Sequence, residues 1–246
     1  MNYLFPLGFY ILVSLFMGQL NPAFKETVIP GMIIFAITTA TILGLPNPLV
    51  SARESGIFRS YKINGIPAIS VLSIPGLTSI LHVIVVAVII TITAPLFFGA
   101  TLPVNWATFT LIILVTAFVC AGFGVLIGVI SANTRVTILW SQLIFLPSIM
   151  LGGIMAPHGI LSGVLGKISL LLPATYAMDA FRGLAFMQNP SLNPLLSVVI
   201  LLVSGILAFA IAKYLFSWDS HNNTRGGRPV LAFLALVPFI IGMFIM

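Results

Sequence analysis

Side chains that could carry chemistry are few in this chain, and their positions exclude several kinds of function. The four acids lie in expected loops or at the ends of apolar runs: Glu26, Glu54, Asp179 and Asp219. A proton- or sodium-coupled carrier needs ionisable groups near the bilayer midplane, where each costs about 2.5–3.5 kcal/mol on insertion scales. His82 is the single ionisable group in the middle of an apolar run, and we interpret it as a neutral, hydrogen-bonded packing residue. The pattern therefore argues against ion coupling.

Motifs for hydrolysis and nucleotide binding are also absent from the sequence. There is no Gly-x-Ser-Gly, no His-Glu-x-x-His and no pair of acids inside an apolar run. A phosphate-binding loop needs Gly-x-x-x-x-Gly-Lys-Ser/Thr. The only Gly-Lys pair, Gly166-Lys167, has Leu161 in place of the first Gly and Ile168 after the Lys. The single cysteine, Cys120, lies in an apolar run and has no disulfide partner. We expect no catalytic residue, metal or cofactor on this chain.

The composition is that of an integral membrane protein. Hydrophobic residues make up 60% of the 246 residues and charged residues 6%, with a mean hydropathy of +1.21. Soluble domains carry about 25% charged residues. The net charge of +6 does not indicate nucleic-acid binding, because the basic residues are scattered between apolar runs. That distribution is typical of signals that orient membrane spans.

The apolar runs predict an all-helical protein with one transmembrane domain, 1–246. A span needs about 20 apolar residues to cross the hydrocarbon. The predicted spans are 3–20, 29–50, 68–98, 106–130, 136–155, 192–216 and 230–246. Between the fifth and sixth spans, two apolar pieces meet at Pro173, and each is too short to cross. We interpret residues 160–187 as a re-entrant or interfacial helical hairpin.

The basic residues predict the orientation of these spans. With the N-terminus in the cytoplasm, seven basic residues lie in inner loops and three in outer loops, in agreement with the positive-inside rule. The inner set is Arg53, Arg59, Lys62, Arg135, Lys213, Arg225 and Arg228, and the outer set is Lys25, Lys167 and Arg182. The charged insert between the second and third spans then faces the cytoplasm, and the hairpin faces the outside.

The insert reads "ARESGIFRSYKINGIP" and holds three basic residues and one acid between two apolar spans. A single helix over 52–62 would place Ile57, Phe58 and Tyr61 on one arc, with Glu54 in the middle of that arc. One interpretation is an amphipathic helix that lies on the lipid headgroups, with its basic residues as anchors. The other is a docking element, because a lone acid on a lipid-facing side favours a basic partner in another loop or protein.

Two segments of the sequence resemble type-2 ABC transporter permeases. The order of residues in the cytoplasmic coupling helix of that family is matched by Arg53, Glu54, Gly56, Phe58, Arg59 and Pro67. The segment 146–184 is similar to the end of the fifth span and the outer hairpin. Its Pro-x-Thr-Tyr-x-x-Asp-x-x-Arg run consists of Pro173, Thr175, Tyr176, Asp179 and Arg182. The resemblance covers roughly residues 3–216. The sequence departs from the family pattern in two ways: no amphipathic helix precedes the first span, and the seventh span is additional.

The resemblance implies a six-span type-2 ABC exporter fold with a coupling helix, an outer hairpin and an extra seventh span. Such permeases pair as homodimers or heterodimers and dock on two ATPase subunits, which hold the ATP and Mg²⁺. The implied function is ATP-driven export of a hydrophobic or amphipathic substrate, such as a drug, antibiotic, peptide or lipid-like molecule. The short first outer loop, 21–28, favours the drug and antibiotic export branch. The implied location is a bacterial plasma (inner) membrane. An ATP-independent channel or facilitator is the alternative.

The resemblance also implies roles for individual side chains. The residues expected to couple to the ATPase are Arg53, Glu54, Gly56, Phe58 and Arg59. The outer hairpin residues are Pro173, Tyr176, Asp179 and Arg182. Asp179 and Arg182 are three residues apart on a presumed helix and so can pair. The pair is interpreted either as a structural clamp or as part of an outer gate, since Tyr176 and Phe186 suit the interface with water.

Polar side chains inside the spans leave two interpretations open. The candidates are Thr38, Thr39, Thr41, Gln142 and Ser148. They could line a transport pathway, or they could satisfy backbone carbonyls and neighbouring helices. Gly124-x-x-x-Gly128 in the fourth span allows another helix to approach closely, and we interpret it as packing inside one subunit.

Overall fold

The computed structural model describes residues 3–20, 24–154, 161, 163–218 and 229–245. Every regular element in these ranges is a helix, which confirms the all-α fold class. In chain order the elements are α1 (Leu4–Leu20), α2 (Phe24–Thr38), the π-helical turn η1 (Thr39–Leu43), α3 (Pro46–Glu54), α4 (Ile57–Ile63), α5 (Ala68–Phe98), α6 (Trp106–Ile130), α7 (Thr134–Leu151), α8 (Gly163–Ser169), α9 (Pro173–Ala180), the π-helical turn η3 (Phe181–Ala185), α10 (Pro194–Leu215), the 3-10 helix η4 (Pro229–Leu236) and α11 (Val237–Ile245).

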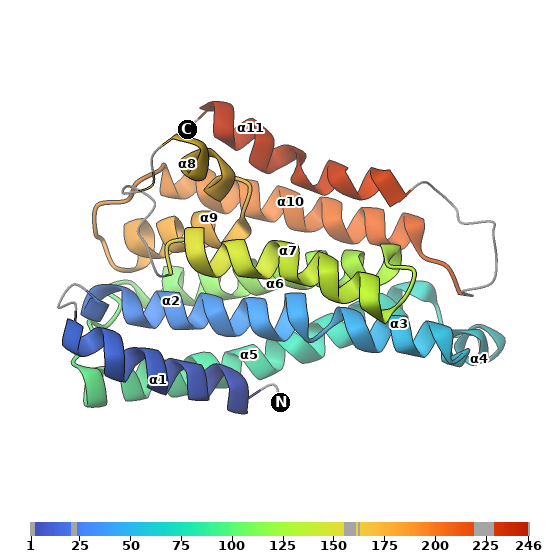
Figure 1. Cartoon of the computed structure of the whole chain (residues 1–246), viewed down its shortest axis with the longest axis horizontal. Coiled ribbons are helices and arrows are strands. Elements are labelled where there is room, and N and C mark those ends of the chain that lie inside the picture. The colour runs from blue at the N-terminus through green and yellow to red at the C-terminus, as the bar shows by residue number, and fades with distance from the viewer. Residues whose placement is uncertain (1–2, 21–23, 155–160, 162, 219–228, 246) are drawn as a thin grey trace.

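The helices form an elongated bundle with two distinct ends (Figure 1). α4 lies at one end, called the insert end here, and α8 and α9 lie near the other, called the hairpin end. Five described helices are long and apolar enough to cross a membrane: Phe24–Glu54, Ala68–Phe98, Trp106–Ile130, Thr134–Leu151 and Pro194–Leu215. α1 and the C-terminal pair η4–α11 are shorter apolar helices. α8 and α9–η3 meet at a bend of 83°, which is the shape of a broken span or a re-entrant loop.

The second long helix differs from the prediction at its far end. It continues from Phe24 to Glu54 through η1, whereas the prediction ended a span at residue 50 and began a separate helix at residue 52. Pro46 does not interrupt it, because a proline is tolerated in the first turn of α3. The helix ends where Gly56 adopts a left-handed backbone conformation, with φ of 77°. The predicted single helix 52–62 is therefore wrong: its first turn belongs to α3 and the rest is α4.

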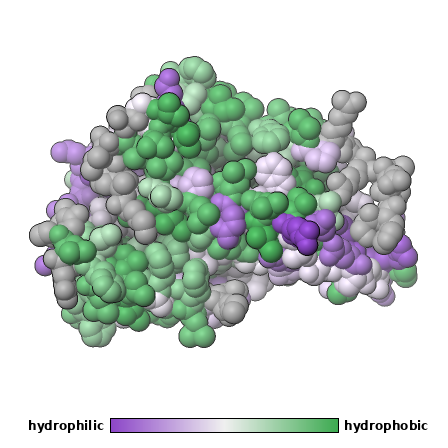
Figure 2. Space-filling view, viewed as in Figure 1, coloured by the Kyte–Doolittle hydropathy of each residue, from purple (hydrophilic) through white to green (hydrophobic). Residues whose placement is uncertain are grey.

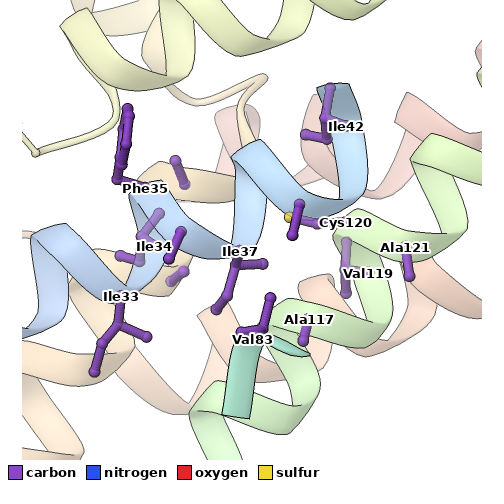
Figure 3. Packing of buried hydrophobic residues seen from close by; sticks show 14 of the residues in the cluster. Ile33, Ile34, Phe35, Ile37, Ile42, Val83, Ala117, Val119, Cys120 and Ala121 are labelled. Carbon is purple, nitrogen blue, oxygen red and sulfur yellow. The ribbon is translucent and has the colours of Figure 1, made fainter. Parts of the chain in front are cut away.

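α6 is the central helix of the bundle, and small residues let its neighbours approach closely. In Figure 3, Ala117, Val119, Cys120 and Ala121 of α6 lie among buried side chains of α2, η1 and α5. A side chain added at Gly124 would collide with the carbonyl oxygen of Thr41. One added at Gly128 would meet Leu49 of α3 at 3.0 Å. The interpretation of the Gly-x-x-x-Gly motif as packing inside one subunit is confirmed.

The outer surface of the bundle visible in Figure 2 is mostly apolar, and its largest polar area lies near the insert end. Figure 2 shows hydrophobic residues over most of the visible face, with polar residues gathered on the side of α3 and α4. Large apolar side chains are exposed on the outward faces of the long helices, for example Leu81, Leu139 and Ile206, each more than half exposed. Such a surface requires a lipid environment, because large exposed apolar areas are unfavourable in water.

Candidate functional site

Arg53, at the end of α3, is held inside the subunit. Its side chain is only 5% exposed. The guanidinium donates one hydrogen bond to the carbonyl of Val129, at 2.9 Å, and another to the carbonyl of Ser131. These carbonyls belong to the C-terminal end of α6, where the last four have no partner within the helix. A cation is also favourable there because of the helix dipole. Arg53 thus caps α6. These two hydrogen bonds point into the subunit, and the expected role of Arg53 in coupling to the ATPase stays a prediction.

Glu54 and the start of α4 form the exposed part of the insert. Glu54 and Arg59 are exposed, and Gly56 makes the turn between α3 and α4. Phe58 is 4% exposed and packs against Phe216, with ring centroids 5.6 Å apart. Because the helix breaks at Gly56, Glu54 does not lie among apolar side chains as the single-helix arc required. The insert presents a charged surface that Phe58 anchors on one side and Arg53 on the other.

The turn between α6 and α7 lies directly beneath this surface. Ser131 is fully buried, and its carbonyl accepts from Arg53. Asn133 then starts α7 as an N-cap, since its side-chain oxygen accepts from the backbone N–H of Val136 at 3.0 Å. The end of α3 is therefore tied to both helices that meet at this turn.

At the opposite end, α9 is buried along its whole length. Pro173 occupies the first turn of α9, where it needs no backbone donor. Thr175 donates to the carbonyl of Ser169 at 2.5 Å and so stabilises the bend between α8 and α9. Tyr176 is fully buried, and its hydroxyl donates to the carbonyl of Phe239 in α11 at 3.4 Å. Phe186 is also buried, so neither aromatic side chain is exposed on the surface of the subunit, and the gate interpretation stays a prediction.

Asp179 binds backbone groups rather than Arg182. One carboxylate oxygen accepts from the N–H groups of Ser191 and Leu192, at 2.7 and 2.8 Å. The other accepts from the hydroxyl of Ser197 at 3.5 Å. Asp179 and Arg182 form no direct ion pair in the described part of the chain, so the predicted contact is not made, and Arg182 acts on the carboxylate only through a longer-range electrostatic attraction. The carboxylate instead clamps α9 to the segment that leads into α10, and these backbone donors leave no signature in the sequence.

The hairpin is also tied to the far end of α6. The hydroxyl of Thr108 donates to the carbonyl of Leu184 at 2.8 Å. The backbone N–H groups of Val104 and Asn105 both donate to the carbonyl of Ala185, at 2.8 and 3.0 Å. Both carbonyls belong to the last residues of η3, where carbonyls have no partner within the helix. α6 therefore connects the insert at one end with the hairpin at the other.

Comparison with protein families matches residues 1–186 of the chain to the ABC-2 type transporter model. The chain belongs to this family. It is accordingly a permease component of an ABC transporter, a multi-pass membrane protein that works with an ATPase on a separate chain. No curated protein and no solved structure matched in the corresponding comparisons. The matched residues of the permease include the insert and the hairpin but not α10, η4 or α11.

Most of the polar candidates for a pathway in the permease are bonded to their own helices. Thr38 donates to the carbonyls of Ile34 and Phe35, Thr41 to that of Ile37, and Ser148 to that of Ile144. All three are buried, so the structure favours the backbone-bonded alternative for them. Thr39 is 8% exposed, and Gln142 is half-buried. Similarly, Nδ1 of His82 lies 2.6 Å from the carbonyl of Thr78, in agreement with a hydrogen-bonded packing role.

Proposed function

We propose that this permease is the membrane subunit of an ATP-driven exporter, with the exposed face of α3–α4 as the docking site for its ATPase. The observation that carries the proposal is the charged surface around Glu54, which Arg53 holds rigidly against the end of α6. A rigid, exposed acid outside the apolar surface suits contact with another protein. The headgroup-anchor alternative explains the basic residues of the insert but gives Glu54 no role.

The distribution of charge supports a cytoplasmic insert end. The basic residues in described segments at this end are Arg53, Arg59, Lys62, Arg135 and Lys213, and those at the hairpin end are Lys25, Lys167 and Arg182. Cytoplasmic loops carry an excess of lysine and arginine. The permease would then sit in a plasma membrane with its ATPase below and its hairpin outside. The family resemblance favours two ATPase copies, which would carry the ATP and Mg²⁺, and a second permease subunit.

Closure of the ATPase would reach the outer side through α6. This helix of 25 residues is bonded at one end to Arg53 and at the other to η3. A push on the end of α3 would move α6 as a rigid body and so shift the hairpin. Pro173, Tyr176 and Asp179 are buried within one subunit, and we assign them to holding the hairpin rather than to the surface of a gate.

The proposed cargo is a hydrophobic or amphipathic molecule. The outward face of α7 is strongly apolar, with Leu139 and Met150 each more than 60% exposed. A second permease subunit placed against such a face would enclose an apolar seam. The only buried acid among the described residues is Asp179 of α9, which is already bonded, so a cationic substrate would find no complementary group in the described interior.

The experiment that tests the proposal compares Glu54→Gln with Arg59→Ala/Lys62→Ala in the complete transporter. Docking predicts that Glu54→Gln lowers substrate-stimulated ATP hydrolysis and export while the permease inserts normally. Ser60→Ala, an exposed change on the same insert, is the matched control and should have no effect. If Glu54→Gln is harmless and the double variant impairs insertion instead, the insert is a headgroup anchor. Substrate flux that persists without the ATPase would favour the channel or facilitator.

A further inference from the structure

A cavity of about 440 Å³ lies between α6, α7, the α8–α9 hairpin and η4. This volume falls within the usual range of ligand pockets, about 300–1,000 Å³. Each of the four elements contributes lining residues, such as Leu126, Trp140, Leu172 and Phe233. Among the described residues, all that line the cavity are apolar or aromatic, and the ring nitrogen of Trp140 is the only side-chain hydrogen-bond donor. The cavity therefore suits an apolar chain.

One wall of this cavity lies outside the residues that match the family. η4 follows the matched region, which ends at residue 186. It is held against the bundle by the hydroxyl of Ser204, which donates to the carbonyl of Ala235 at 2.6 Å. The rings of Trp140 and Phe233 meet edge to face across 6.1 Å. The C-terminal segment is thus fixed beside α7 and encloses space that the matched residues alone leave open.

A second apolar hollow provides a useful contrast. It has a volume of about 710 Å³ and lies between α5, α6 and the connection that contains Leu102. Trp106 is among its lining residues. The described residues that line this hollow include none from the hairpin or the C-terminal segment, so it is a groove between two neighbouring helices of the bundle. Bulk lipid would fill such a groove without selection, whereas the cavity behind η4 is bounded on four sides.

A cation stands next to the cavity at the hairpin end. Lys167 is exposed and directly precedes Ile168, which lines the cavity. It is the only charged residue of α8. A single lysine near a membrane surface attracts anionic lipids, so an occupant with an apolar chain and a negative headgroup matches both features. We propose that the cavity binds an acyl chain of a phospholipid with an acidic headgroup, which Lys167 attracts. This inference does not depend on the direction of transport.

The tryptophans of the chain allow a direct test on the purified permease without its ATPase or cargo. Trp106→Phe/Trp218→Phe leaves Trp140 as a reporter inside the cavity, and Trp140→Phe/Trp218→Phe leaves Trp106 in the groove as the matched control. The probes are phospholipids brominated on their acyl chains, with either an acidic or a zwitterionic headgroup, which quench nearby tryptophan. Quenching of Trp140 should prefer the acidic lipid by about fivefold. Quenching of Trp106 should follow the bulk composition.

Two further variants separate the chain site from the headgroup contact. Ala232→Phe fills the cavity from η4 and should remove the selective quenching of Trp140, whereas Ala210→Phe on the exposed face of α10 should not. Lys167→Gln, a surface change that leaves the packing intact, should abolish the headgroup preference. The proposal is overturned if Lys167→Gln keeps the preference or if Ala232→Phe leaves quenching unchanged. It also fails if neither brominated lipid quenches Trp140 and cross-linking through α7 shows that a second permease copy occupies the opening of the cavity.

Discussion

Replacing Arg53 distinguishes a cap inside the subunit from a contact with the ATPase. Arg53→Met keeps a long side chain but removes the guanidinium and its two hydrogen bonds to the end of α6. A hydrogen bond to a charged group contributes about 1.5–3 kcal/mol. Water at the insert end would re-satisfy part of what is lost, so we expect a loss of about 2–4 kcal/mol of stability. For a chain of this size, this corresponds to a fall of roughly 5–10 °C in Tm.

The assay is thermal unfolding of the purified permease, followed by ATP hydrolysis in the complete transporter. Glu54→Gln changes the neighbouring exposed residue and serves as the control, with an expected stability change within about 0.5 kcal/mol. Arg53→Lys should be intermediate, because an ammonium keeps the charge but cannot reach two carbonyls as a planar fork does. In the complex, Glu54→Gln should raise the permease concentration needed for stimulation, and Arg53→Met should lower the maximum.

The opposite pattern would refute this account of the insert. If Arg53→Met unfolds at the wild-type temperature but weakens ATPase binding, the guanidinium faces the partner and does not cap α6. If both substitutions destabilise the isolated permease equally, Glu54 also has a structural partner within the subunit, and the docking surface must be sought elsewhere on α4.

Three other predictions concern the hairpin end. Asp179→Ala should destabilise the purified permease by about 2–4 kcal/mol in thermal unfolding. Exchanging the charges of Asp179 and Arg182 should not restore the lost stability, because the carboxylate binds backbone N–H groups. If the exchange does restore stability, the two residues form an ion pair after all. Gly242→Ala would place its new carbon 2.7 Å from the hydroxyl oxygen of Tyr176 and should lower the stability of the permease by about 1–3 kcal/mol. In a double-mutant cycle, Tyr176→Phe should restore part of this stability because it removes the hydroxyl. Thr108→Val should leave ATPase docking intact but reduce the export that each hydrolysed ATP drives, and unchanged coupling would exclude α6 as the connection.

The fold class and the helices were predictable because the membrane imposes them. Backbone polar groups in hydrocarbon must be satisfied within the chain, so long apolar runs can only be helices there. The Gly124-x-x-x-Gly128 motif was also readable, since small residues at this spacing serve helix packing. The end of the second helix was not, because the apolar run stops at Val50 whereas the helix continues to Glu54, and Gly56 supplies the break.

The partners of the polar side chains were less predictable, for a physical reason. Arg53 and Asp179 both bind backbone groups of segments far along the chain, at Val129 and at Ser191. Any residue type supplies such a carbonyl or N–H, so no pattern of side chains announces the contact. Spacing arguments consider only side-chain partners, and they therefore paired Asp179 with Arg182. The one available indication was that an expected loop lies beside an apolar span near Asp179. Backbone N–H groups at such a chain reversal can serve as hydrogen-bond donors for the carboxylate.

These backbone contacts limit how the two ends of the permease can communicate. Between Arg53 and Thr108 the interior is built mainly from apolar packing, with some hydroxyls bonded within their own helices, such as Thr41, and with Thr116 of α6 buried without a hydrogen bond from its hydroxyl to any described residue. A relay of switching hydrogen bonds would need polar groups that exchange partners along this path. A tightly packed helix with directional bonds at its two ends can instead transmit displacement as a rigid body, because packed interiors deform little. In the proposed exporter, movement of the insert would thus reach the hairpin by translation or rotation of α6.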